Sequence, residues 1–126
     1  MLFWLFCLVM DLLIPIAMIA LGRRFLTHPP KKINGSYGYR TTRSMKNQQT
    51  WDFAHQTCGR LWVRMGLILL PVSVAAMLPA VGRTIDTISV FCIVLCVVQV
   101  VVMLFSILPV ELALKRRFDE LGRPRM

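Results

Sequence analysis

Three long apolar stretches dominate this sequence and limit what the chain can fold into. They cover residues 1–22, 65–81 and 88–108, and segments rich in lysine, arginine and proline separate them. As a helix, the first stretch is about 31 Å long at a rise of 1.5 Å per residue, enough to cross the hydrocarbon core of a bilayer. The pattern predicts an all-α integral membrane protein with three transmembrane helices in a single membrane domain, residues 1–126.

The positive charge of the chain is concentrated beside the apolar stretches. The formal net charge is +9, and 56% of the residues are hydrophobic. Because the basic residues are not interleaved with the apolar ones, we expect them to contact membrane lipids and not to bind nucleic acid directly. The first stretch lacks a basic start and a small-residue cleavage site, so it is interpreted as a retained span and not a secretory signal.

The polar segment 23–64 contains a second helical pattern. Ser44 is the candidate N-cap of a helix over residues 45–62, which we expect to lie in the membrane interface between the first and second spans. Its apolar side chains recur at helical spacing: Trp51, Ala54, His55, Cys58, Leu61 and Trp62.

The second span is short and contains Pro71 and Pro79, each of which removes a backbone donor, so we expect it to be bent. The connection 82–87 is too short for a domain, and it predicts that the second and third spans are antiparallel neighbours. A basic tail, 109–126, follows the third span.

The distribution of basic residues predicts the orientation. Nine lysines and arginines lie in 23–64, five lie after residue 114 and one lies in 82–87. With three spans, the loop and the tail share one side, and the positive-inside rule makes that side cytoplasmic. The N-terminus is then expected outside.

The four cysteines, Cys7, Cys58, Cys92 and Cys96, show no paired spacing typical of a zinc site. We therefore interpret them as apolar packing residues and expect no metal and no other cofactor.

Asp11 is the most unusual residue of the first span. A carboxylate at the bilayer centre costs roughly 2.5 to 3.5 kcal/mol on insertion scales. It is either tolerated inside the bundle or a subunit contact, or it binds a ligand or exchanges a proton. Gln99, near the middle of the third span, is a candidate hydrogen-bond partner for it.

The loop after the first span carries a distinctive motif, Asn-Gly-Ser-Tyr-Gly-Tyr-Arg-Thr, at residues 34–41. Gly38 permits a close backbone approach, and the guanidinium of Arg40 suits bidentate contact with a carboxylate or phosphate. The alternative is an ordinary aromatic belt with a flanking arginine. The order and spacing of the whole set favour a clamp at head-group level.

This stretch resembles the SdpI-type immunity-protein family, whose pattern is approximately N-x-x-Y-G-Y-R-T, a spacer, and W-x-x-A-N. The matching residues are Asn34, Tyr37, Gly38, Tyr39, Arg40, Thr41, Trp51 and Ala54. One departure is His55, which stands where the family usually has asparagine and whose ring nitrogens can also form hydrogen bonds. The segment 118–122 resembles the closing F-D-x-x-G of the family, so the likeness covers most of the chain.

The resemblance implies a bacterial protein of the inner cell membrane that protects its producer from a secreted peptide toxin by binding and not by catalysis. Neither His28 nor His55 belongs to a catalytic constellation, so no enzyme activity is expected. Two alternatives stay open. One is a signal-transduction scaffold that sequesters a cytoplasmic regulator; the other is an accessory subunit that forms a homo- or hetero-oligomer through its spans.

Overall fold

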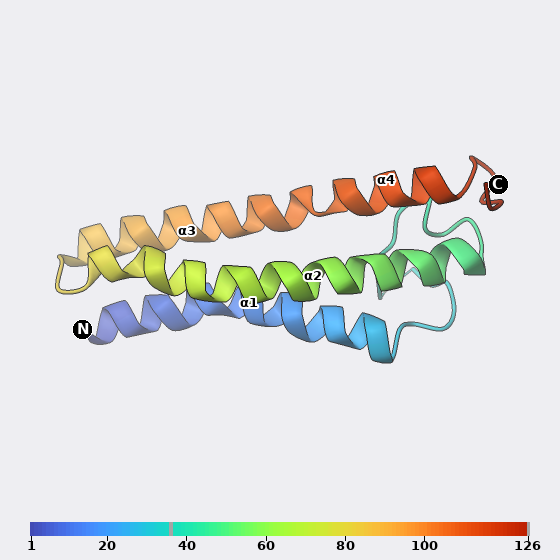
Figure 1. Cartoon of the computed structure of the whole chain (residues 1–126). Helices are drawn as coiled ribbons and strands as arrows, with labels where there is room; N and C mark the ends of the chain where they lie inside the picture. The colour runs from blue at the N-terminus through green and yellow to red at the C-terminus, as the bar shows by residue number, and fades with distance from the viewer. Residues whose placement is uncertain (36, 126) are drawn as a thin grey trace.

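The computed structural model describes residues 1–35 and 37–125, and these residues are helical apart from the connections (Figure 1). The helices are α1 (Leu2–Thr27), α2 (Gln48–Met77), the short 3-10 helix η1 (Leu78–Ala80), α3 (Ile85–Phe105) and α4 (Ile107–Arg117). Three helical segments are long and apolar enough to cross a membrane: Leu2–Thr27, Gln48–Ala80 and Ile85–Arg117. The prediction of three apolar helices in an all-α protein is confirmed.

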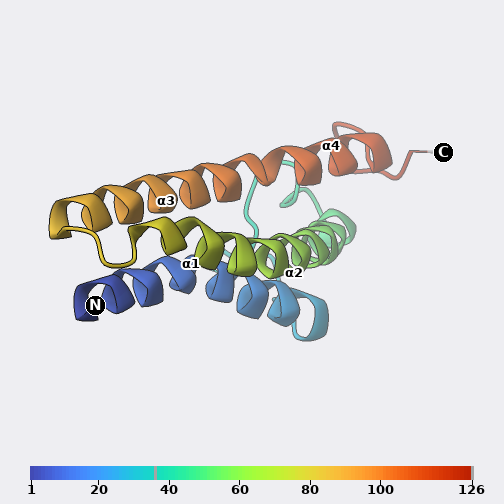
Figure 2. The same cartoon turned by 60° about the vertical axis from the view of Figure 1, so that its left-hand side comes forward.

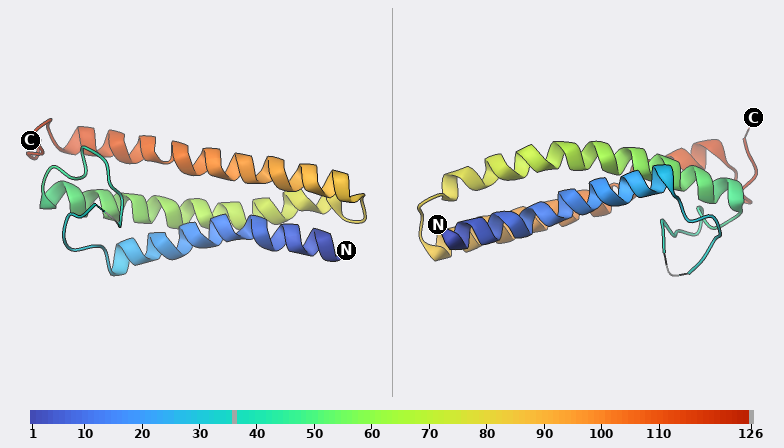
Figure 3. Two further views of the ribbon diagram at one scale, coloured as in Figure 1. Left: turned by 180° about the vertical axis from the view of Figure 1, so that it is seen from behind. Right: turned by 90° about the horizontal axis from the view of Figure 1, so that it is seen from below.

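The three long segments lie side by side, and their connections separate to opposite ends. The N-terminus and the α2–α3 connection lie at one end; the α1–α2 loop and the C-terminus lie at the other (Figures 1 and 3). Gly82, with a φ of 75°, makes the tight turn between α2 and α3. The two helices are therefore antiparallel neighbours, as expected.

Close backbone approach holds α1 against α2, the most extensive helix pairing in the molecule (Figure 2). A Cβ added at Gly22 would lie 2.8 Å from the carbonyl oxygen of Gly59, and one added at Gly59 would lie 2.7 Å from the carbonyl oxygen of Gly22. At Gly66 an added Cβ would lie 2.5 Å from the side chain of Ile19. Small residues permit such contact in membrane helices, where dispersion forces and not water drive the association.

Two groups of buried side chains mark the two ends of the bundle. At the end of the α2–α3 connection the indole of Trp4 donates to the carbonyl of Met77 at 2.8 Å, beside a cluster of Trp4, Cys7, Met77, Ala80, Ile88 and Leu95. At the loop end the cluster is Phe25, Tyr39, Ala54, Cys58, Val110, Leu114 and Phe118. Much of the remaining apolar surface is exposed, as expected for helices in lipid.

The segment between the first two spans differs from the prediction. No separate interfacial helix is found over 45–62, because α2 runs without interruption from Gln48 to Met77. The apolar stripe of that segment is the packing face of a longer helix: Trp51, Ala54 and Cys58 are buried. The N-cap is Asn47 and not Ser44; its side chain accepts from the backbone N–H of Thr50 at 2.9 Å in a capping box.

The ends of the spans also differ. α1 continues past residue 22 to Thr27 because Phe25 is buried against the loop and α2. Pro71 lies inside α2, which is bowed when seen from below (Figure 3), whereas Pro79 lies in η1, where the helix ends.

Beyond Ser106, α4 continues almost in line with α3 (Figure 1), so the first part of the expected tail is helical. Pro109 fits there because the first turn of a helix needs no N–H from it.

Candidate functional site

The motif loop lies against the first turns of α2, and Gly38 is where the two come closest. Its φ is +112°, a conformation that residues with a Cβ rarely adopt. A Cβ at this position would also lie 2.5 Å from Nε2 of His55 and 3.1 Å from Cγ of Pro30. Glycine is therefore required here both by backbone conformation and by space.

His55 holds the loop to α2 through both ring nitrogens. The backbone N–H of Tyr39 donates to Nε2 at 2.9 Å, which requires Nε2 to be unprotonated. The proton then lies on Nδ1, which donates to the carbonyl of Trp51 at 2.8 Å. The imidazole is buried, 4.4 Å from the ring of Trp51 and 4.9 Å from that of Phe25. The fixed neutral tautomer makes His55 a positioning residue for the motif.

Trp51 fixes the start of the loop. Its indole Nε1–H donates to the carbonyl of Pro30 at 2.7 Å, and its side chain is fully buried. Because Pro29 and Pro30 stop α1 from continuing, the chain turns here and comes back across α2. The side chain of Trp51 therefore holds the backbone of the loop, and it is too buried to contact a ligand.

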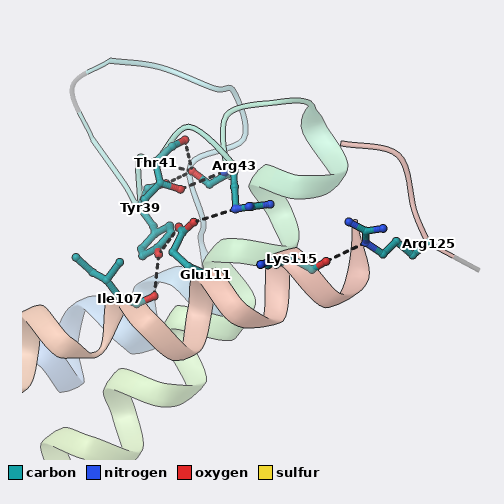
Figure 4. A network of polar contacts seen from close by, with 8 residues as sticks. Tyr39, Thr41, Arg43, Ile107, Glu111, Lys115 and Arg125 are labelled. Carbon is teal, nitrogen blue, oxygen red and sulfur yellow. Dashed lines mark hydrogen bonds and ion pairs between the residues drawn. The ribbon is translucent and has the colours of Figure 1, made fainter. Parts of the chain in front are cut away.

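Tyr39 ties the loop to α4, as Figure 4 shows. Its hydroxyl donates to Oε1 of Glu111 at 2.8 Å, and the other carboxylate oxygen pairs with Nε of Arg43 at 3.9 Å. Burial raises the pKa of the Tyr39 hydroxyl far above its usual range, and the neighbouring carboxylate of Glu111 raises it further. The neutral phenol is thus a permanent donor that links the loop to α4.

Thr41 closes the motif in a reciprocal turn with Ser44. The N–H of Thr41 donates to Oγ of Ser44 at 2.8 Å, and the N–H of Ser44 donates to Oγ1 of Thr41 at 3.1 Å. The Ser44 hydroxyl also donates to the carbonyl of Tyr39 at 3.0 Å. These bonds satisfy backbone groups of the loop that lie outside any helix and so lack helical hydrogen-bond partners.

Other motif residues face outward. The side chain of Asn34 accepts from the N–H of Tyr37 at 2.7 Å, and the Tyr37 ring lies edge-on to Phe25 with 6.1 Å between centroids. Arg40 is exposed and donates to the carbonyl of Gly35. The motif therefore divides into buried residues that position the loop, such as Tyr39, and exposed residues, Tyr37 and Arg40, whose side chains a ligand can reach.

An apolar groove of about 260 Å³ opens beside this arginine. Its walls come from the end of α1, the motif loop, the middle of α2, the end of α3 and the first residue of α4. Arg40 is the charged residue among those that line it, which are Phe25, Gly38, Tyr39, Arg40, Thr41, Cys58, Trp62, Met103, Leu104 and Ile107. Arg40 therefore lines an apolar groove in part, while its guanidinium bonds to the carbonyl of Gly35.

Asp11 lies in a different site, within the transmembrane part. It is fully buried, and its Oδ1 accepts from the thiol of Cys96 at 2.7 Å and from that of Cys92 at 3.5 Å. The expected bond from Gln99 is not formed, because its amide donates to Oγ of Ser73 at 2.7 Å. The sequence predicts packing roles for the two thiols, whereas the structure shows that both also donate to Asp11; their spacing of four on one helix is the sequence signal for this shared role.

Comparison with known proteins identifies a family for this chain. The model of the SdpI/YfhL protein family matches residues 31–110, which include the motif loop, α2, α3 and the start of α4. The chain belongs to this family.

A curated relative from Bacillus subtilis (strain 168), named "Uncharacterized protein YfhL", is 42% identical over 52 residues. That match covers 41% of this chain and 47% of the relative, so it spans about half the length of that SdpI/YfhL protein. No solved structure matches the chain.

Proposed function

We propose that this SdpI/YfhL-family protein confers immunity to a secreted antimicrobial peptide by binding it in the membrane, without catalysis. The observation that supports the proposal best is the apolar groove with Arg40 at its edge, next to the loop that carries the family motif. Apolar walls suit the side chains of a membrane-active peptide, and a guanidinium suits a carboxylate such as a peptide C-terminus.

The size of the groove sets how much of a peptide it holds. Its volume of about 260 Å³ is below the roughly 300 to 1,000 Å³ typical of sites that enclose a whole small ligand. We therefore propose that one or two apolar side chains enter the groove, and that the rest of the peptide lies along the exposed apolar surface of α3.

Arg40 provides the direct test. In a toxin-sensitive bacterium, Arg40→Ala is expected to reduce protection at least tenfold, measured as the minimum inhibitory concentration of a candidate peptide. Arg40→Lys is expected to recover only part of it, because an ammonium cannot form the planar two-point contact. Membrane abundance should stay unchanged in both, since the Arg40 side chain is exposed.

Equal protection by wild-type and Arg40→Ala protein at matched abundance would refute the proposed contact. Gly35→Ala is the matched control: it changes the same loop, but an added Cβ meets nothing within 4 Å.

We further propose that the loop and tail are cytoplasmic and the N-terminus is outside, in a bacterial inner membrane. In a variant without native cysteines, Gly35→Cys and Glu120→Cys should resist a membrane-impermeant maleimide added to intact cells, whereas Arg83→Cys should react. The reason is the concentration of basic residues at the loop end of the bundle. Labelling of Gly35→Cys with protection of Arg83→Cys would reverse the assigned orientation.

A second candidate function is a signalling scaffold for a cytoplasmic regulator. One observation favours it: the basic tail is ordered against α2. Asn47 donates to the carbonyl of Gly122 at 2.6 Å, and the guanidinium of Arg117 lies 5.4 Å from the ring centroid of Phe53. A fixed basic surface suits an acidic partner. Pull-down of a cytoplasmic protein by the intact chain, but not by a chain without residues 118–126, would assign the tail to this second function.

A further inference from the structure

Asp11, Cys92 and Cys96 bring three metal-binding atoms together inside the bundle. One ligand atom from each lies within 4.8 Å of the others. The carboxylate comes from α1 and both thiols come from α3, one turn apart. Cys7, one turn before Asp11 on α1, is close enough to interact with the thiol of Cys92 and adds a further sulfur beside the group.

The hydrogen bonds of the cluster do not satisfy Asp11. Its Oδ1 accepts from both thiols, but its Oδ2 is buried and has no hydrogen-bond partner among the described residues. A buried carboxylate oxygen with no partner is costly in a low-dielectric interior. An additional positive group at this position would relieve that cost.

We propose that Asp11, Cys92 and Cys96 form a binding site for a thiophilic divalent d10 cation of the Zn²⁺ class. Thiolate sulfur and carboxylate oxygen are ligands that such ions accept, and three protein ligands leave the fourth position of a tetrahedral site for water or another ligand. This site is separate from the groove beside Arg40, so the proposal is independent of toxin immunity.

Charge balance favours binding inside the bilayer. On binding, each thiol releases one proton to water and becomes a metal-bound thiolate, so two protons leave as one divalent ion enters. The two positive charges that enter therefore equal the two that leave. The ion adds no charge to the hydrocarbon region and gives Oδ2 a partner.

The site also has a structural consequence. α3 buries few side chains, with Ile88, Leu95 and Gln99 facing the other helices. Cys92 and Cys96 lie at the margin of this face and are partly exposed. A metal ion held between them and Asp11 would therefore fasten α3 to α1 at mid-membrane depth.

The test uses the purified full-length chain in detergent micelles, with thiols kept reduced by a phosphine and without chelators. Titration with Cd²⁺ should give thiolate-to-metal charge-transfer absorption that saturates at one ion per chain. Zn²⁺ should compete for the site, release about two protons per ion and raise the melting temperature. Cys58→Ser is the matched control, since Cys58 lies in the loop-end cluster and should leave the titration unchanged.

Cys96→Ser and Cys92→Ser should each lower the Cd²⁺ affinity at least tenfold, and Asp11→Asn should weaken binding while keeping the charge-transfer band. Circular dichroism and size exclusion identify which variants are folded. If folded wild-type protein gives no more absorption or stabilisation than the folded Cys92→Ser/Cys96→Ser variant, the site is refuted. Loss of the signal in Cys58→Ser but not in Cys96→Ser would refute it equally.

Discussion

Replacement of Gly59 by leucine is expected to destroy the pairing of α1 and α2. An added Cβ alone would lie 2.7 Å from the carbonyl oxygen of Gly22 and 3.0 Å from Cγ of Leu26. Leucine carries three further carbons into the same space, and backbone atoms cannot move aside as a flexible side chain can. Overpacking usually lowers the free energy of unfolding by about 1 to 3 kcal/mol. Because the added carbons of Gly59→Leu meet backbone atoms, we expect a loss of about 3 kcal/mol or more.

The measurement is the melting temperature and the membrane abundance of the Gly59→Leu variant. The matched control is Ala75→Leu, which adds a leucine to the exposed surface of the same helix and should have little effect. Gly22→Ala, on the other side of the contact, should give an intermediate loss because it adds only one carbon. Equal melting temperatures for Gly59→Leu and Ala75→Leu would show that the helices do not pack through these glycines.

The distribution of apolar residues along the chain predicts much of the fold. Apolar runs of bilayer length specify three helices because a backbone in lipid must satisfy its hydrogen bonds within each segment. The short connection at residues 82–87 similarly leaves α2 and α3 no choice but to be antiparallel. Helix boundaries are less predictable: Arg60 and Arg64 suggest a polar limit to the second span, yet α2 continues through both. Long basic side chains reach the interface from within a helix, so they do not mark its end.

Contacts between distant parts of the chain were not predictable. The spacing of the motif marks its residues, but it does not indicate that Tyr39 bonds to Glu111, 72 positions away. Nor does it show which motif residues point inward and which point outward. The meeting of Asp11 with Cys96, 85 positions apart, depends on how α1 rotates against α3. That rotation is set by side-chain packing across the whole bundle, for which a single sequence carries no local signal.

Replacement of Gly38 by alanine is expected to release the motif loop while leaving the helices folded. The substitution meets two obstacles. Its Cβ would lie 2.5 Å from Nε2 of His55, and its φ of +112° is strained for any residue with a side chain. The bond from the N–H of Tyr39 to His55 must then lengthen or break, because both obstacles lie beside it.

Hydrogen exchange at the Tyr39 amide measures this loss directly. That amide is expected to exchange at least tenfold faster in Gly38→Ala than in wild-type protein, with helix content unchanged because the α1–α2 contact lies elsewhere. The double variant Gly38→Ala/His55→Ala removes the clash but keeps the strained φ and loses the acceptor. It should therefore exchange as fast as the single variant, because the acceptor of the Tyr39 amide is gone.

A toxin-protection assay distinguishes the effect of the clash with His55 from the effect of the strained φ at residue 38. If the clash with the imidazole is what moves Arg40 away from the groove, Gly38→Ala should cost less protection in a His55→Ala background than in wild-type protein, because the imidazole is already absent there. If backbone strain dominates, Gly38→Ala should cost as much protection in that background as in wild-type protein. An unchanged exchange rate and full protection in Gly38→Ala, matching Gly35→Ala, would contradict the close approach of the loop to His55. In that case the position of Arg40 would not depend on the contact between Gly38 and α2.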